Sequence, residues 1–250
     1  MPAASDSTPS SPWCPRIVAH RGANNLAPEN TRAAIQQCLS LNVAVMELDV
    51  RASRDGVLYN FHDSHLHRTT NGTGSIELRS SAYIDTLDAG SWFAPEFAGE
   101  PVPRIDAILR EFSQDFAFFL DIKSGSISEI IALLRDYKIA ETAFVWFGSS
   151  ARDRAFREQA PEIARKVNIK DEKELLTKAV DTGARYVEVD QSRLDKDLVK
   201  RAHEHDIFVM MADHEGTERS FCTAFRAGVD LINLDCPERF VAFQASTSPC

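Results

Sequence analysis

Short apolar runs alternate with longer amphipathic segments along most of this chain. Eight runs have the length and the aromatic or β-branched content of buried strands: 17–20, 45–50, 116–122, 143–147, 163–167, 186–190, 207–212 and 229–234. Stretches with helical spacing lie between several of them: 31–40, 128–137, 173–182, 196–205 and 218–227. This alternation predicts an α/β fold, a closed (β/α)8 TIM barrel. A doubly wound open sheet is the alternative, disfavoured because no glycine-rich dinucleotide loop follows a strand.

The segment 56–103 interrupts the alternation. It begins with a short extra strand at 57–61 and continues as a polar region rich in Thr, Gly and Ser, too long for an ordinary βα loop. It follows the second barrel strand, and therefore lies at the carboxyl face, where barrel enzymes carry their chemistry. The segment either covers the active site or has a purely structural role. We expect a flexible tail at 1–15 and one barrel domain at 16–250 that contains this insertion.

Composition narrows the function. The chain has 250 residues, 44% hydrophobic and 26% charged, which predicts a folded core rather than disorder. A net charge of −9 argues against nucleic-acid binding, but a small phosphate compound stays possible because a bound metal ion reverses the local field. No apolar run approaches the length of a bilayer span, so we expect no stable membrane insertion. The sequence predicts no particular oligomeric state.

The cysteines and the first residues bear on the compartment. The five cysteines are spread along the chain, with no metal-binding spacing: Cys14, Cys38, Cys222, Cys236 and Cys250. The amino-terminal stretch lacks the basic start and apolar segment of a secretory signal. Both observations predict reduced thiols and a cytoplasmic location. A chain that had lost its leader would show the same pattern.

Carboxylates at the ends of two predicted strands indicate a metal site. Glu47 and Asp49 point the same way, because a strand alternates faces with period two. Paired inward carboxylates are costly unless something neutralises them. Oxygen ligands favour one divalent cation, Mg²⁺ or Ca²⁺, over zinc; a salt-bridged strand end is the alternative. Asp121 is the expected third ligand, and Lys123 can hold a phosphoryl oxygen.

Two histidines complete the candidate chemistry. His20 and His62 each stand at the end of a predicted strand. The histidine side chain can give and take protons near neutrality, so the two can act as general acid and general base on a phosphodiester. A structural role is the alternative for each. Arg21 can grip a phosphate with its planar guanidinium or form a salt bridge with Glu47. No serine or cysteine nucleophile with an adjacent base is evident.

In order and spacing, this run of motifs resembles the glycerophosphodiester phosphodiesterases, a family of metal-dependent TIM barrels. The motifs are His20-Arg21-Gly22, Glu47-Leu48-Asp49, His62-Asp63, the segment 28–31 and the segment 68–74, and the resemblance is densest over 17–123. It implies that a vicinal glycerol hydroxyl attacks phosphorus, an alcohol leaves, and water opens a cyclic phosphate. One histidine acts as base and the other as acid. The implied products are sn-glycerol 3-phosphate and an alcohol, which points to lipid and glycerol metabolism.

The sequence departs from the family in two places. The family usually has Glu where this chain has Asp121, whereas the similar spider-type sphingomyelinases D use Asp with Lys two residues on. The seventh barrel strand ends in Met210-Met211-Ala212-Asp213 instead of a Trp-Thr-x-Asn-like motif, while Asp235-x-Pro237 is kept. Loss of that tryptophan removes a flat wall, so the specificity is expected to be unusual.

Further polar residues are secondary candidates. Glu188 either binds substrate hydroxyls or pairs with Arg185 or Arg193, and Glu29 or Asn30 is expected to contact the active-site network. The remaining histidines are not expected to be catalytic, although one of them can line the rim: His65, His67, His203, His205 and, at the rim, His214.

These observations predict a metal-dependent hydrolase of small glycerophosphodiesters. One alternative is a phosphodiesterase for another diester, of lysophospholipase D-like, sphingomyelinase D-like or sugar phosphodiester type. The other is an inactive barrel that binds phosphate ligands. The presence of both histidines, the three carboxylates and Lys123 argues against the inactive barrel.

Overall fold

The computed structural model describes residues 14–246 and 250, so most of the tail predicted at 1–15 lies outside the described residues. Within the described part, one sheet contains nine strands: β1 (Arg16–Ala19), β2 (Val45–Ala52), β3 (Leu58–Asn60), β4 (Ala117–Ile122), β5 (Phe144–Phe147), β6 (Ala164–Ile169), β7 (Tyr186–Asp190), β8 (Phe208–Asp213) and β9 (Leu231–Leu234). Each predicted barrel strand overlaps an observed one.

The sheet closes into a barrel. Its strand order is β1-β9-β8-β7-β6-β5-β4-β2, and β1 also pairs with β2, which joins the two ends. All pairings around this ring are parallel, while β3 adds to β2 in antiparallel fashion outside it. The predicted TIM barrel with an insertion after its second strand is therefore confirmed.

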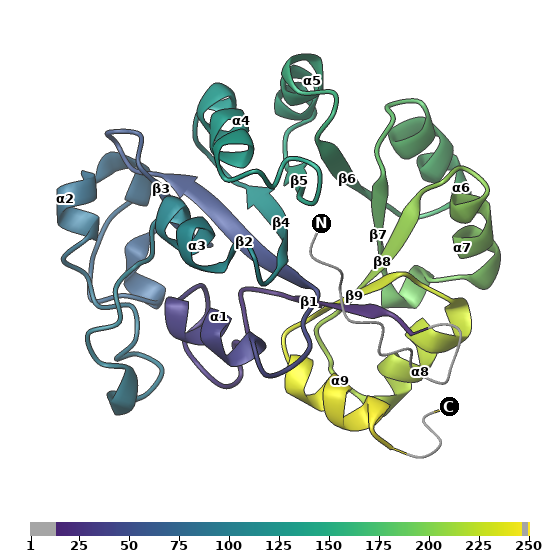
Figure 1. Cartoon of the computed structure of the whole chain (residues 1–250), viewed down its shortest axis with the longest axis horizontal. Helices are drawn as coiled ribbons and strands as arrows, with labels where there is room; N and C mark the ends of the chain where they lie inside the picture. The colour runs from purple at the N-terminus through teal and green to yellow at the C-terminus, as the bar shows by residue number, and fades with distance from the viewer. Residues whose placement is uncertain (1–13, 247–249) are drawn as a thin grey trace.

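Helices surround the strands (Figure 1). They are α1 (Arg32–Cys38), α2 (Ser81–Ile84), α3 (Ile105–Phe112), α4 (Ile127–Asp136), α5 (Ser150–Gln159), α6 (Glu172–Glu174), α7 (Lys196–His203), α8 (Glu218–Ala227) and α9 (Pro237–Gln244). The helix predicted at 173–182 is instead α6 followed by the π-helix η4 (Leu175–Val180). Single turns of 3₁₀-helix occur at η1 (Leu66–Arg68), η2 (Ile76–Leu78), η3 (Pro95–Phe97) and η5 (Gln191–Arg193).

Stacked aromatic rings lie inside the barrel, toward the amino ends of its strands. Phe119 stacks on Phe144 with centroids 4.8 Å apart, Phe144 on Tyr186 at 4.1 Å, and Tyr186 on Phe208 at 5.3 Å. These rings come from β4, β5, β7 and β8, and stacked pairs stabilise beyond the area they bury. Because inward positions recur every second residue, the next inward layer toward the carboxyl ends carries the polar side chains.

The insertion between β2 and α3 has a small core of its own. It projects beside β2 on one side of the barrel (Figure 1). Its buried apolar residues are Tyr59, Phe61, Leu66, Ile76, Ile84, Leu87, Ala89 and Val102. The insertion is thus a packed subdomain rather than a loose loop, and it begins immediately before the His62 motif.

Two observations bear on the expected compartment. Cys222 and Cys250 form a disulfide, with Cα atoms 5.4 Å apart, whereas Cys14, Cys38 and Cys236 are free. The disulfide shows that the expectation of reduced thiols throughout is wrong. Disulfides persist mainly in oxidising compartments. The cytoplasmic location stays a prediction, and the disulfide argues against it. Among the described residues, no helix is long and apolar enough to cross a membrane.

Candidate active site

Three carboxylates converge at the carboxyl end of β2 and β4. Glu47 and Asp49 point inward from β2, and Asp49 lies directly opposite Asp121 in the β2–β4 register. Each of the three offers an oxygen, and these oxygens lie within 4.8 Å of one another. Glu47 and Asp49 are each only 1% exposed. The structure thus brings together the three residues predicted as metal ligands.

The electrostatics of this cluster are unfavourable without a counter-charge. Burial raises the pKa of Glu47 well above its usual value, and the charges of Asp49 and Asp121 raise it further. Burial also raises the pKa of Asp121, although Lys123 opposes the change. For Asp49, burial acts upward too, but the charges of Lys123 and Arg21 prevail and lower its pKa. Three carboxylates held this close together, two of them buried, match the environment that a divalent cation stabilises.

The free oxygens of the cluster fit a cation. Within the described residues, Asp49 Oδ1 and Asp121 Oδ1 are buried and accept no hydrogen bond. The Lys123 ammonium lies 3.3 Å from Asp49 Oδ1 and forms an ion pair with Asp121 Oδ2. Buried acceptors without donors are rare and require an explanation. Because all three groups are oxygen ligands, the cluster can hold a hard divalent cation.

His20 stands at the end of β1 with one ring nitrogen fixed. Its Nδ1 lies 2.6 Å from Asp235 Oδ1, and Asn24 Nδ2 donates to the same oxygen at 2.9 Å. The second oxygen, Asp235 Oδ2, lies 3.1 Å from His214 Nδ1. An ionised carboxylate accepts, so His20 Nδ1 is the donor and Nε2 is left for the substrate. His214 does line the rim, as the sequence predicted.

His62 is held in the same way. Its Nδ1 lies 2.7 Å from Asp63 Oδ1, and its carbonyl accepts a hydrogen bond from Arg51 Nε at 2.7 Å. Arg68 Nε donates to Asp63 Oδ2 at 2.6 Å. The charge of His62 contributes to lowering the pKa of Asp49, so the histidine lies close to the carboxylate cluster. Both predicted catalytic histidines therefore lie beside the cluster, each with its Nδ1 held by a carboxylate.

Glu29 joins the first barrel loop to the insertion. It accepts hydrogen bonds from Arg21 Nη1 at 3.0 Å and from Arg68 at 2.7 and 2.8 Å. Its neighbour Asn30 donates to Asp49 Oδ2 at 2.9 Å. Both residues of the segment 28–31 that were expected to reach the site do so.

Arg21 faces the cluster in an unexpected manner. Its backbone N–H, not its guanidinium, donates to Glu47 Oε2 at 2.7 Å, so the salt bridge with Glu47 that was the alternative for Arg21 is not formed. The guanidinium Nε lies 3.3 Å from Asp49 Oδ2. This geometry follows from the left-handed backbone of Arg21, whose φ is 59°, at the turn that leaves β1. A guanidinium beside the cluster is positioned to hold a phosphoryl oxygen.

Glu188 belongs to the opposite wall of the mouth. Within 14–246 it pairs with Lys166 and accepts from Asn233 Nδ2 at 3.2 Å, rather than pairing with Arg185 or Arg193. Lys166 and Asn233 are not among the residues predicted from the sequence. Lys166 does have a sequence signal, because it is a lone lysine at an inward position of a buried strand. The role of Asn233 depends on its neighbours and has no such signal.

One cavity contains most of these groups. It has a volume of about 620 Å³ and reaches from Glu47 and Asp121 past Trp146 to Glu188 and Asn233. His20 and His214 separate it from a second hollow of about 670 Å³ between the first and last barrel loops. Trp146 comes from β5, directly opposite Asp121 in the register. The mouth thus keeps a tryptophan wall despite the methionines of β8.

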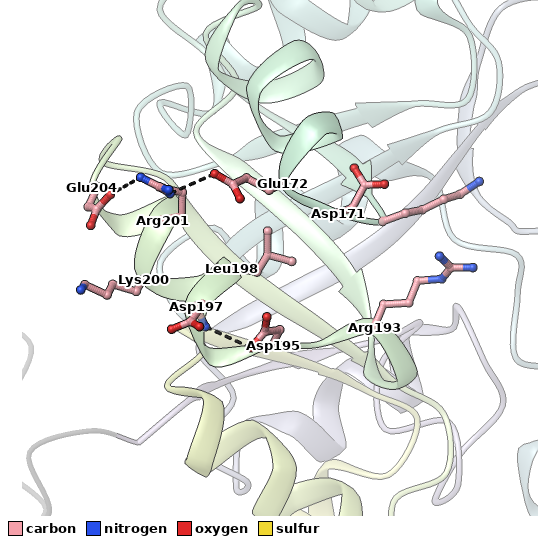
Figure 2. Close-up of a pocket in the computed structure, with 10 residues that line it drawn as sticks. Asp171, Glu172, Arg193, Asp195, Asp197, Leu198, Lys200, Arg201 and Glu204 are labelled. Carbon is pink, nitrogen blue, oxygen red and sulfur yellow. Dashed lines mark hydrogen bonds and ion pairs between the residues drawn. The ribbon is translucent and has the colours of Figure 1, made fainter.

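A neighbouring hollow does not qualify as a site (Figure 2). It has a volume of about 550 Å³ and lies around α7. Arg201 reaches Glu172 at 3.1 Å and Glu204 at 3.4 Å, and Asp195 caps α7 by accepting from the Asp197 N–H. Several of its charged side chains are therefore engaged with one another or with the helix end.

Comparison with known proteins identifies the fold and the site together. The model of the glycerophosphoryl diester phosphodiesterase family matches residues 20–237, which include every residue of the cluster and both histidines. The chain belongs to this family. It is therefore a phosphoric diester hydrolase.

Individual relatives agree with this family membership. YhdW of Bacillus subtilis (strain 168), which carries a provisional glycerophosphodiester phosphodiesterase name, is 30% identical over 89% of this chain and 95% of its own. A glycerophosphodiester phosphodiesterase structure from Agrobacterium tumefaciens str. C58 is 33% identical, with a TM-score of 0.87 over 92% of this chain and 100% of that one. A phosphodiesterase from Oleispira antarctica, solved with its product sn-glycerol-3-phosphate, is 25% identical, with a TM-score of 0.82 over 91% and 96% of the two chains.

Proposed function

We propose that the protein hydrolyses glycerophosphodiesters to sn-glycerol 3-phosphate and an alcohol with the help of one divalent cation. One observation carries this proposal: three carboxylates converge at a cavity that Glu47 and Asp121 line together with His20, whose Nδ1 is held by Asp235. The product bound to the Oleispira antarctica relative supports the choice of substrate.

Glu47, Asp49 and Asp121 would hold the cation, for which Mg²⁺ or Ca²⁺ suits the oxygen ligands. When bound, the cation supplies positive charge that polarises a phosphoryl oxygen. Arg21 and Lys123 lie beside the same carboxylates and hold the other phosphoryl oxygens. With a cation held by Asp121, the ammonium of Lys123, which pairs with that carboxylate here, would be available to the phosphoryl group.

The two histidines move the protons. In the first step, the hydroxyl next to the ester bond attacks phosphorus; the new O–P bond forms as the bond to the alcohol oxygen breaks. One of His20 and His62 accepts the hydroxyl proton at Nε2, and the other donates a proton to the departing oxygen. In the second step water forms a bond to phosphorus as the P–O bond made in the first step breaks; the histidines exchange roles, one accepting the water proton and the other returning a proton to the released hydroxyl oxygen. Asp235 and Asp63 fix both rings with Nε2 available throughout.

The test uses the purified protein and a panel of diesters that share the glycerol 3-phosphate group. We expect release of sn-glycerol 3-phosphate, loss of turnover after chelation, and recovery on addition of Mg²⁺ or Ca²⁺. Release of the phosphorylated alcohol instead would contradict the proposed cleavage site. Full turnover by a chelated preparation would contradict the role of the cation.

Asp121 with Lys123 two residues on favours one second candidate, a sphingomyelinase D-like activity toward choline-containing lipids. The same assay with sphingomyelin separates the two: release of ceramide phosphate supports the second candidate.

A further inference from the structure

Three polar side chains form a cluster on the wall of the mouth away from the carboxylates. Lys166 projects inward from β6, Glu188 from β7 and Asn233 from β9. Lys166 forms an ion pair with Glu188 Oε2, and Asn233 Nδ2 donates to Glu188 Oε1 at 3.2 Å. The Lys166 side chain is only 3% exposed and Asn233 only 5%. These three residues line the same cavity as the metal cluster.

Stability does not account for this polar cluster. Removing both charges of an ion pair from water costs about as much as their attraction returns, and an apolar layer of similar volume is often at least as stable. Moreover, within the described residues, Asn233 Oδ1 is buried and accepts no hydrogen bond. An unpaired buried acceptor is itself unfavourable unless a ligand or water donates to it. The cluster therefore has the features of a binding surface that is completed by a ligand.

A flat aromatic face borders the cluster. The Lys166 ammonium lies 4.9 Å from the Trp146 ring centroid and 4.8 Å from that of Phe119. Trp146 is partly exposed and lines the cavity between Lys123 and Lys166. Its ring offers an apolar plane next to hydrogen-bonding groups, which suits a saturated ring that carries hydroxyls on its edge.

We propose that this wall is a subsite for a polyhydroxylated ring, a sugar or a cyclitol, which forms the alcohol part of the diester. The inference rests on the proposed function. A hydroxyl both donates and accepts, so it can donate to Asn233 Oδ1 and Glu188 while accepting from Lys166. Lys166 would repel an alcohol with a positive charge, and Glu188 would repel an alcohol with a negative charge. The glycerol part stays with the phosphate at the carboxylates, and about 620 Å³ has room for both parts.

The test compares two substrates that differ only in the hydroxyls of the ring. Glycerophosphoinositol carries the hydroxyls, and cyclohexyl glycerophosphate has the same ring size without them. We expect kcat/KM at least about tenfold higher for the inositol diester, since a site built to bind hydroxyls rejects an analogue that lacks them. Asn233→Leu, which removes the acceptor at similar volume, should bring this ratio close to one by lowering the inositol value. Gln36→Leu makes a comparable amide-to-leucine change at an exposed position of α1, outside the residues that line this cavity, and should keep the ratio.

Equal kcat/KM for the two diesters in the unmodified protein would overturn this inference alone, because diester hydrolysis itself would stand. Hydrolysis of neither diester would overturn the inference, and would reject the proposed function as well if the other glycerophosphodiesters of the panel also stay intact. The comparison on the unmodified protein requires no variant to fold. An Asn233→Leu protein with native circular dichroism and an unchanged ratio would also count against the subsite.

Discussion

At the scale of single residues, the site depends on carboxylates in two different roles. Glu47, Asp49 and Asp121 face one another, and among the described residues two of their buried oxygens accept no hydrogen bond, whereas Asp63 and Asp235 are each bound by a histidine. Hydrogen bonds from the histidines and from Arg68 or Asn24 lower the pKa of Asp63 and Asp235 despite burial. The first set is therefore available to a cation, and the second orients the rings.

Replacement of either histidine tests the second role. We expect His20→Ala and His62→Ala each to lower kcat by about a hundredfold or more, because each removes a general acid or base. The double variant should be hardly slower than the single ones, since the two residues act as a unit. Near-native kcat in either single variant, measured by release of the phosphomonoester, would remove that residue from the mechanism.

Glu47→Gln tests the first role. The variant should fold, because the apolar core does not depend on that charge, but it should lose turnover and cation binding. Thermal unfolding with and without Mg²⁺ or Ca²⁺ measures binding independently of catalysis, since a ligand of the native state raises the melting temperature. We expect the cation to stabilise the unmodified protein and an exposed control, Glu172→Gln, but not Glu47→Gln. An equal shift in all three would place the cation elsewhere.

At the scale of elements, the insertion contributes residues to the candidate active site. His62 follows β3, and Arg68 in η1 connects Asp63 to Glu29 of the first barrel loop. These contacts join two segments that lie far apart in sequence. The position of one catalytic histidine thus depends on how the insertion docks on the barrel.

Arg68→Gln tests this docking. Bonds from Arg68 and charges from Arg21 and Arg68 overcome burial and lower the pKa of Glu29 below 4.5, and Arg68 bonding lowers that of Asp63 below 3.8. Carboxyls with lowered folded-state pKa values stabilise the fold fully above their unfolded values, and the contribution is lost as the pH falls below them. We therefore expect Arg68→Gln to cost about 1 kcal/mol at pH 7 and less below about pH 4.

The same variant should also lower kcat, because Asp63, which orients His62, loses the hydrogen bonds donated by Arg68. Arg104→Gln is the matched control: it breaks an ion pair with Asp85 inside the insertion that does not reach His62. Denaturant unfolding and initial rates on both variants distinguish the two effects. Equal kcat values in the two variants would show that Arg68 does not position the histidine.

Much of this arrangement follows from the sequence, for identifiable reasons. The barrel strands can be predicted because buried parallel strands are apolar along their length. Glu47, Asp49 and Asp121 can be predicted because side chains alternate between the two faces of a strand, which puts these carboxylates on the inner face. Helix α5 has one buried apolar residue, Phe156, and so lacks a periodic signal, whereas α3 has a clear one at Ile105, Ile108, Leu109 and Phe112. The partner of His20 could not be predicted, because Asp235 follows β9, which meets β1 only when the barrel closes.

At the scale of the whole molecule, the disulfide links α8 to the last residue of the chain. Cys222 and Cys250 are 28 residues apart, and closing a loop of that length restricts the unfolded chain by about 3–4 kcal/mol in the chain-entropy account. We expect Cys250→Ser to lower the free energy of unfolding by up to this amount, measured by denaturant titration under oxidising conditions. A reductant should destabilise the unmodified protein and leave Cys250→Ser unchanged; if both respond alike, the disulfide is not the cause.

The central claim is that a hydroxyl of the substrate itself attacks phosphorus beside the carboxylate cluster. Phosphorus NMR during turnover of a glycerophosphodiester, alongside its analogue that lacks the adjacent hydroxyl, tests this claim most directly. We predict a transient cyclic glycerophosphate followed by sn-glycerol 3-phosphate from the first substrate, and very slow reaction of the second, because intramolecular attack carries a large advantage of proximity. Rapid hydrolysis of the deoxy analogue would mean that water attacks phosphorus directly, and would contradict the roles given to His20 and His62.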